Sequence, residues 1–94
     1  MLFAVLSEPL PTRPSEAAAN RRRYWEWARP LQEAGTMRHV WARAGRGALA
    51  VFEVDGNATL HRLLNEWAEI VPARFDVYPL LDPDAARAFL ATPP

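Results

Sequence analysis

Apolar positions recur along the chain with two different periods, which predict strands in some segments and helices in others. The run Met1–Leu6 is short and apolar, as in a buried strand. Helical spacing is clearest where leucines and a tryptophan recur at i, i+3, i+4 and i+7 across residues 60–67. The predicted strands are Met1–Leu6, Met37–Ala44, Ala48–Val54 and Arg74–Leu81, and the predicted helices are Ser15–Ala34, one around residues 60–67, and a short one within Asp82–Pro94.

Prolines and glycines mark the ends of these elements. Three prolines within Glu8–Pro14 fix φ and remove hydrogen-bond donors, so the first strand is expected to end there. Ser15 is then the expected N-cap of the long helix, and Gly35 its C-terminal stop. Pro30 lies inside that helix and cannot donate to the Glu26 carbonyl, so a kink or a weakened last turn is expected.

The second predicted strand carries residues capable of chemistry on both of its faces. Strict alternation predicts that one face holds Met37, His39, Trp41 and Arg43, and the other Arg38, Val40, Ala42 and Ala44. The turn Gly45–Gly47 predicts a hairpin to the next strand.

The order of elements, βαββαβ with a tail, is that of a ferredoxin-like α+β fold with an antiparallel sheet. Its helices cover only one face of the sheet, so the other face needs a cover. In a single domain of 94 residues, a second copy is the simplest cover, and a dimer is expected. Residues 82–94 are expected to pack on a partner subunit.

Composition excludes several classes of protein. Eleven arginines balance eleven acidic residues, so the chain has no overall attraction for nucleic acid. No segment approaches the roughly 20 apolar residues of a membrane span, and no signal peptide is recognisable, so a cytoplasmic protein is expected. Without cysteine and with two histidines, neither a disulfide framework nor a metal site is expected.

Several segments together resemble a known family. They are the initial Met1-Leu-Phe, the block Leu31-Gln-Glu-Ala-Gly-Thr-Met-Arg-His-Val-Trp41, Ala44-Gly45, Val51-Phe-Glu-Val54 and Leu60-His61. The chain resembles, from Met1 to about Leu81, the muconolactone delta-isomerase family of bacterial aromatic-compound degradation. The resemblance implies a dimeric α+β barrel that assembles further, with decamers as one outcome. It also implies a double-bond shift in a small lactone, performed by proton transfer without metal or organic cofactor.

The chain departs from this family in residues expected to line its site. Members commonly carry a Glu-Lys pair where this chain has Tyr24-Trp25, and this chain contains no lysine. The Arg46-Gly-Ala-Leu segment replaces the family's Tyr-Ala-Asn after the Ala-Gly turn. The substrate therefore need not be muconolactone.

Three residues are candidates for catalysis. His39 could act as a general acid or base near neutrality, or be a strand histidine held within an interface. Glu26 could act as a base among aromatic neighbours, or be a solvated helix residue. The Tyr24 hydroxyl could donate to a developing enolate oxygen.

Four further residues are candidates for substrate binding. Arg38 or Arg43 could hold a carboxylate in a bidentate fork, or form a salt bridge with Glu53 or Asp76 between subunits. Trp25 and Trp41 could line a pocket for a flat ring, or belong to the core.

The function expected from the sequence is a cofactor-free isomerase that acts on a small unsaturated lactone or a related cyclic compound. Two alternatives remain open. One is a non-catalytic ligand-binding or structural oligomer on the same scaffold, and the other is a cyclase of a larger hydrophobic substrate. The expected partners are a small organic substrate and further copies of the chain, and neither nucleic acid nor membrane.

Overall fold

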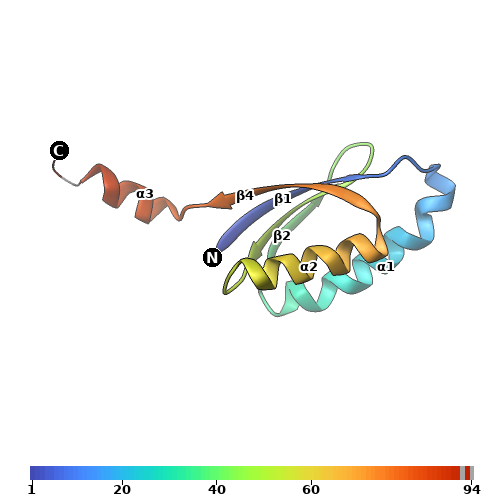
Figure 1. Cartoon of the computed structure of the whole chain (residues 1–94), viewed down its shortest axis with the longest axis horizontal. Coiled ribbons are helices and arrows are strands. Elements are labelled where there is room, and N and C mark those ends of the chain that lie inside the picture. The colour runs from blue at the N-terminus through green and yellow to red at the C-terminus, as the bar shows by residue number, and fades with distance from the viewer. Residues whose placement is uncertain (92, 94) are drawn as a thin grey trace.

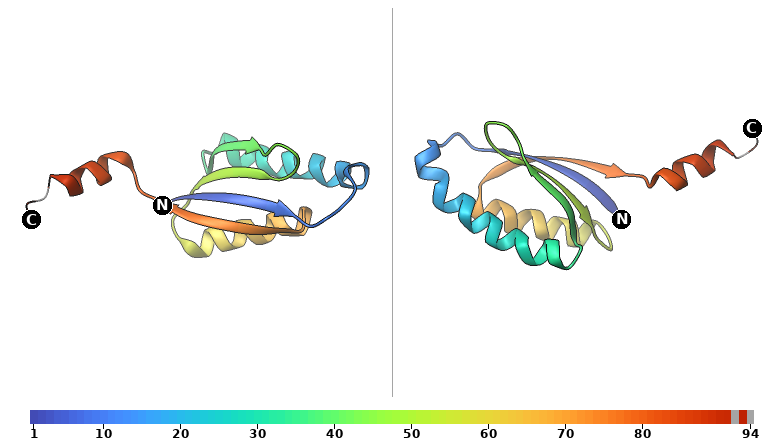
Figure 2. Two further views of the ribbon diagram at one scale, coloured as in Figure 1. Left: turned by 90° about the horizontal axis from the view of Figure 1, so that it is seen from above. Right: turned by 180° about the vertical axis from the view of Figure 1, so that it is seen from behind.

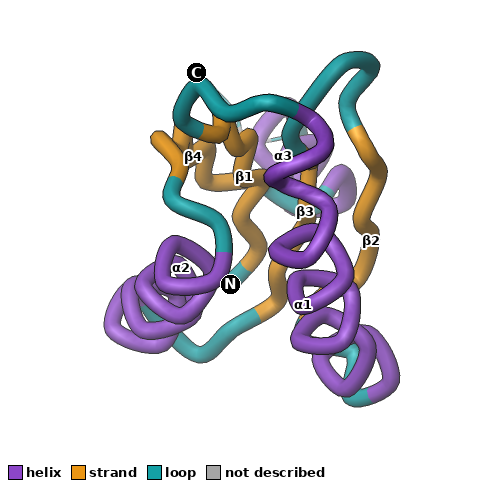
Figure 3. The backbone as a smooth tube through the Cα atoms, turned by 90° about the vertical axis from the view of Figure 1, so that its right-hand side faces the viewer, coloured by secondary structure: helices purple, strands orange, loops and turns teal. Residues whose placement is uncertain are grey.

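The computed structural model describes residues 1–91 and 93, and within them it contains four strands and three helices. Two of the helices, α1 and α2, lie on the same face of one sheet (Figures 1 and 3), while α3 extends away from the body (Figure 1). The elements are β1 (Leu2–Pro9), α1 (Pro14–Glu33), β2 (Met37–Ala42), β3 (Ala48–Glu53), α2 (Asn57–Ile70), β4 (Ala73–Leu80) and α3 (Pro83–Leu90).

The sheet is antiparallel with the strand order β2-β3-β1-β4 (Figure 2). This order, with both crossing helices on one face, confirms the predicted ferredoxin-like α+β fold. The central strand β1 runs to Pro9, three residues beyond the predicted end. The Leu10 N–H donates to the Pro72 carbonyl at 3.0 Å, so the nitrogen of the preceding Pro9 points to the other side. The Pro9 nitrogen thus faces the side of β3, but the pairing of β1 with β3 ends at Leu6. The missing N–H of Pro9 therefore removes no hydrogen bond from the sheet.

Strand β2 contains an irregularity that strict alternation does not predict. Met37 pairs with Phe52 and His39 pairs with Val51, so the register shifts at Arg38. Met37 is buried under the helices, whereas His39 lies on the opposite, uncovered face. The predicted placement of Met37 on the same face as His39 is therefore wrong, because a bulge at Arg38 adds one residue and reverses the faces.

Helix α1 begins one residue before the predicted start. Its N-cap is Arg13, and Pro14 occupies the first helical position, where the missing N–H has no intrahelical partner to lose. Ser15 is therefore already inside the first turn, and the expected Ser15 cap is not formed. Pro30 does not end the helix, because its carbonyl accepts a backbone N–H at 3.0 Å in the last turn. Gly35, with φ 79°, follows the last turn as predicted.

The core lies between the helical layer and one face of the sheet. Trp67 of α2 is at its centre, with its ring centroid 4.9 Å from that of Tyr24 and 6.3 Å from that of Phe52. The aromatic rings bury a large apolar area and join both helices to β3.

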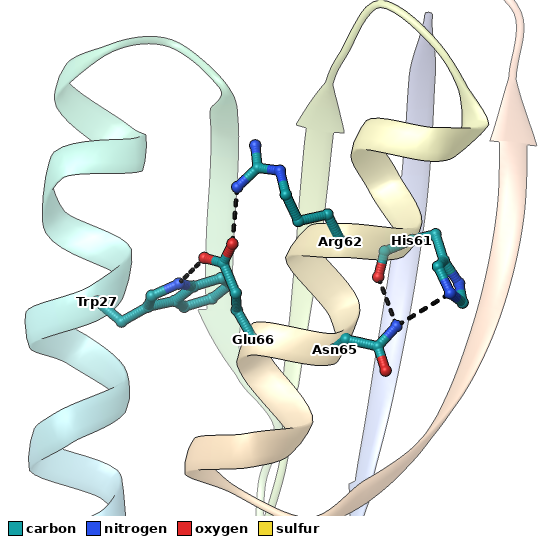
Figure 4. Close-up of polar contacts among 5 residues, drawn as sticks. All are labelled: Trp27, His61, Arg62, Asn65 and Glu66. Carbon is teal, nitrogen blue, oxygen red and sulfur yellow. Dashed lines mark hydrogen bonds and ion pairs between the residues drawn. The ribbon is translucent and has the colours of Figure 1, made fainter.

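A polar contact also joins the two helices that cover the sheet. Trp27 of α1 donates from Nε1 to a carboxylate oxygen of Glu66 at 3.0 Å, and Arg62 contacts the other oxygen at 2.6 Å (Figure 4). The hydrogen bond from Trp27 is the main reason that the pKa of Glu66 lies below its usual value. Arg62 adds to this lowering, and partial burial opposes it.

The sheet face opposite α1 and α2 is uncovered, and we refer to it as the open sheet face. Trp41 and Tyr78 on it are 54% and 50% exposed. By the register of the sheet, this face carries Leu2, Ala4, Leu6, His39, Trp41, Leu49, Val51, Tyr78 and Leu80, together with the charged residues Glu8, Glu53, Arg74 and Asp76.

Helix α3 is a regular helix that extends away from the body and contributes no residue to the hydrophobic core (Figure 1). Asp82 caps it by accepting from the Asp84 N–H at 2.8 Å, in agreement with the short helix predicted for the tail. Phe89 and Leu90 are 76% and 80% exposed, and none of its residues is buried. Across residues 1–91 and 93, every helix is too short or too polar to cross a bilayer.

Candidate functional site

A cavity of about 510 Å³ lies between the first half of α1 and one end of the sheet. This is within the size range of small-molecule sites, roughly 300–1,000 Å³. Its walls come from the end of β1 with the proline-rich linker that follows, residues 17–25 of α1, the turn between β2 and β3 with the strand ends beside it, and the end of α2 with the residues that follow it.

Tyr24 brings the most unusual polar group to this cavity. Its side chain is only 5% exposed, and its ring packs against Trp67 and, edge to face, against Trp25 at 5.1 Å. The hydroxyl oxygen is buried and makes no hydrogen bond within the described residues. Burial raises the pKa of Tyr24 well above its usual value, so the hydroxyl keeps its proton at any physiological pH. It is therefore a donor without an acceptor, in a place where an unmade bond costs about 1–3 kcal/mol.

Three arginines also line the cavity. Arg43 donates from Nη1 to the Ser7 carbonyl at 2.8 Å, and Arg46 donates from Nη1 to the Thr12 carbonyl at 2.7 Å. Arg21 lies on an exposed turn of α1 at the rim. Among the described residues of the lining there is no aspartate or glutamate, so these positive charges are not neutralised inside the cavity. Such a site favours an anion, and guanidinium groups favour a carboxylate or phosphate.

Aromatic rings and prolines form the apolar part of the wall. Trp25, which is 41% exposed, and Trp67 contribute their indoles, and Pro9, Pro11 and Pro72 complete the surface. A planar ring could stack on such a wall. Polar capacity besides the arginines comes from Ser7, Thr12 and Asn20.

Three of the seven residues predicted for the site line the cavity. They are Tyr24, Trp25 and Arg43. Arg43 had been expected to share a face with His39, but β2 ends at Ala42 and alternation ends with it. The Arg43 N–H donates to the Gly47 carbonyl at 2.9 Å, and its side chain reaches the end of β1.

The other four predicted residues lie outside the cavity in one copy of the chain. His39 and Trp41 stack on each other on the open sheet face, with ring centroids 5.3 Å apart and an angle of 7° between the planes. Arg38 pairs with Glu53 within the same chain at 2.5 Å. Glu26 lies on the exposed side of α1. One copy therefore does not bring the three predicted catalytic residues together.

Arg46 and Arg21 were not predicted as site residues. The turn that carries Arg46 is pressed against β1: Gly47 has φ 97°, and a Cβ there would lie 2.4 Å from the Ser7 carbonyl oxygen. The sequence signal that could have indicated Arg46 is its place between two glycines. In the predicted fold, this turn lies opposite the proline-rich linker.

The chain is a small α+β protein with a muconolactone isomerase-like fold. A crystal structure of muconolactone isomerase superposes with a TM-score of 0.67 and 29% identity, over 87% of this chain and 90% of that one. The 5-chloro-2-hydroxyhydroquinone dehydrochlorinase from Burkholderia phenoliruptrix, in complex with 2,5-dihydroxybenzoquinone, gives a TM-score of 0.73 over 90% of this chain and 98% of that one. At 13% identity, this second likeness shows the fold alone.

The chain belongs to the family described as "Domain of unknown function (DUF3303)", which matches residues 1–93. No curated protein is significantly similar to it in sequence. The resemblance to muconolactone isomerase inferred from the sequence is thus confirmed at the level of the fold.

Proposed function

We propose that this protein is a cofactor-free isomerase that transfers a proton on a small, unsaturated cyclic carboxylate, such as a lactone, bound in the cavity beside Tyr24. The observation that carries the proposal is the pairing of a buried, unpartnered Tyr24 hydroxyl with three arginines that no carboxylate of the described lining neutralises. The muconolactone isomerase likeness supports the reaction type.

Tyr24 supplies the acid half of this reaction. Proton removal next to a carbonyl group places negative charge on the carbonyl oxygen, and a fixed donor in a dry site stabilises that charge. The pKa of Tyr24 is raised by burial, so the hydroxyl stays neutral and donates. The three arginines of the lining give the cavity the positive charge that attracts the carboxylate, and Trp25 provides a surface for the ring.

The general base that removes the proton is His39 or Glu26. Both lie outside the cavity in one copy, so either one acts only if the assembled oligomer brings it to the bound substrate. Replacing each in turn, as His39→Ala and Glu26→Gln, and measuring turnover separates the two.

The second candidate function is ligand binding without catalysis. It is favoured by one observation: the described part of the cavity lining contains neither a carboxylate nor an imidazole. A binding protein would take the same anionic rings and release them unchanged.

The oligomer is part of the same proposal. The open sheet face carries many apolar side chains and is uncovered, and we expect a second copy to cover it and the tail, residues 82–94, to pack on that copy. Deleting residues 82–94 is then expected to weaken association while the far-UV circular dichroism of the body is retained. A cytoplasmic location is proposed with it, and cell fractionation tests it.

The experiment follows proton exchange at carbon. The protein is incubated in D₂O with muconolactone and with other unsaturated lactone carboxylates, and NMR records deuterium incorporation and double-bond position. Tyr24→Phe is expected to lower kcat by about 10²–10³-fold and to weaken binding by no more than about 10-fold.

Tyr78→Phe removes a tyrosine hydroxyl from the open sheet face and serves as the matched control, provided that sedimentation velocity shows the same assembly as in the unmodified protein. Its kcat is expected to equal that of the unmodified protein. If the protein binds a lactone carboxylate tightly but deuterium exchange is no faster than without protein, the isomerase proposal is wrong and ligand binding without catalysis takes its place.

A further inference from the structure

Arg46 is held in place by contacts to a distant part of the chain. From the turn between β2 and β3, its Nη1 donates to the Thr12 carbonyl at 2.7 Å and, more weakly, to the Leu10 carbonyl at 3.4 Å. Both acceptors belong to the linker between β1 and α1. The close packing of Gly47 on the Ser7 carbonyl fixes the turn itself. The side chain therefore has its position set before any ligand arrives.

The same guanidinium has a buried donor that nothing satisfies. Among residues 1–91 and 93, the buried side-chain polar atoms without a partner are Arg46 Nε and the Tyr24 hydroxyl oxygen. Both residues line the same cavity, one from the turn and one from the helical layer. An unmade bond to a buried charged group is expensive, so an acceptor supplied by a ligand would stabilise this arrangement.

The geometry of the guanidinium group indicates which ligand fits. Its Nη1 is engaged with the linker, which leaves the opposite edge, formed by Nε and Nη2, without a hydrogen bond in the described part of the chain. Two parallel N–H groups on one edge match the two oxygens of a carboxylate. Lysine has no such edge, and it would offer a point charge only.

The other two cations of the cavity are placed differently. Arg43 donates to the Ser7 carbonyl, and it is an exposed residue. Arg21 is exposed at the rim, where solvent screens its charge. They raise the positive potential of the cavity, whereas Arg46 alone combines a fixed position with a buried vacant donor.

We propose that Arg46 determines the specificity of this site by binding the substrate carboxylate through its Nε and Nη2 edge. The substrate class is a small ring that carries one carboxylate and a second acceptor oxygen, which the Tyr24 hydroxyl meets. This inference rests on the proposed function. It adds a specificity residue in a segment where the sequence departs from the resembled family.

The test measures binding of three probes to the purified full chain at neutral pH, by NMR of the tryptophan indole resonances. Benzoate carries a ring and a carboxylate, phenol carries the ring and a hydroxyl, and phenyl phosphate carries a different anion. In Arg46→Gln and in Arg46→Lys, the benzoate affinity is expected to fall roughly 10- to 100-fold. Phenol affinity is expected to stay within about threefold, because the ring wall is intact.

Arg22→Gln is the matched control, because Arg22 is exposed on α1 and does not line the cavity. It removes the same charge, and its benzoate affinity is expected to equal that of the unmodified protein. If Arg22→Gln loses as much affinity as Arg46→Gln, the effect is one of net charge, and the proposal is overturned.

The other possible results of these binding measurements also test the role of Arg46. Unchanged benzoate affinity in Arg46→Lys would contradict binding through two N–H groups of one guanidinium edge. Tighter binding of phenyl phosphate than of benzoate would contradict the preference for a carboxylate. If Arg46→Gln fails to fold, Arg46→Lys carries the test, since its ammonium can still donate to the Thr12 carbonyl. If the unmodified protein binds none of the three probes, the proposed function fails as well. Loss confined to the Arg46 variants leaves that function standing.

Discussion

The two faces of the sheet are built from the same strands and both carry many apolar side chains, yet only one is buried in a single copy. Along β3, Phe52 and Ala50 point to the helices and are fully buried, whereas Val51 and Leu49 point the other way and are partly exposed. The difference comes from the helices, because α1 and α2 both lie on one side. Apolar side chains on a sheet face thus indicate that the face is covered in the assembled protein. The position of α1 and α2 decides which of the two faces is left for a second chain to cover.

Truncation on the helix-covered face should have the largest effect. Phe52→Ala removes a fully buried ring that packs on Trp67, so we expect the free energy of unfolding to fall by about 3–5 kcal/mol. Val51→Ala, one residue away on the open sheet face, should cost about 1 kcal/mol or less in dilute protein. Urea denaturation measures both, and equal losses would contradict the difference between the faces.

A charge on the open sheet face should act on assembly more than on folding. Val51→Asp would leave an unpaired carboxylate buried between two copies, which costs several kcal/mol and weakens association more than about 100-fold. Sedimentation velocity measures the change, and far-UV circular dichroism should stay that of the folded chain. An unmodified protein that sediments as a monomer at high concentration would remove the basis for this expectation.

The smallest effect concerns the contact between the helices. The pKa of Glu66 is lowered by Trp27 and Arg62, so its contribution to stability is complete above the ordinary glutamate value of about 4.3. That contribution is lost as the pH falls from there through the lower folded value. Because Glu66 is partly exposed to solvent, the loss should stay below about 1 kcal/mol.

Unfolding measured against pH tests this expectation. In Glu66→Gln, the free energy of unfolding should fall less at acidic pH, by the amount that Glu66 contributes. Glu69→Gln, on the same helix, should show the same acid dependence as the unmodified protein. An identical acid dependence in all three would mean that the contact with Trp27 does not stabilise the charged form.

Local patterns predicted the order of the elements, because the helical and strand periods need no information beyond each segment. They failed at β2, where the bulge at Arg38 reverses the faces of the strand. Tyr24, which is buried, and Trp25, which is 41% exposed, both line the cavity, and their roles in catalysis and binding stay predictions. Arg46 was missed because its partner, Thr12, lies 34 residues away, and only the folded turn brings the two together.

Three of the eleven arginines line the cavity, and the chain as a whole has no net charge. The other eight arginines are outnumbered by the eleven carboxylates, so the residues that do not line the cavity carry three more negative than positive side-chain charges. An approaching anion would be repelled by most of the exterior and drawn in only at the mouth, within about one Debye length, 8 Å at physiological ionic strength. Capture would then be governed by orientation at short range, and its rate should depend only weakly on added salt.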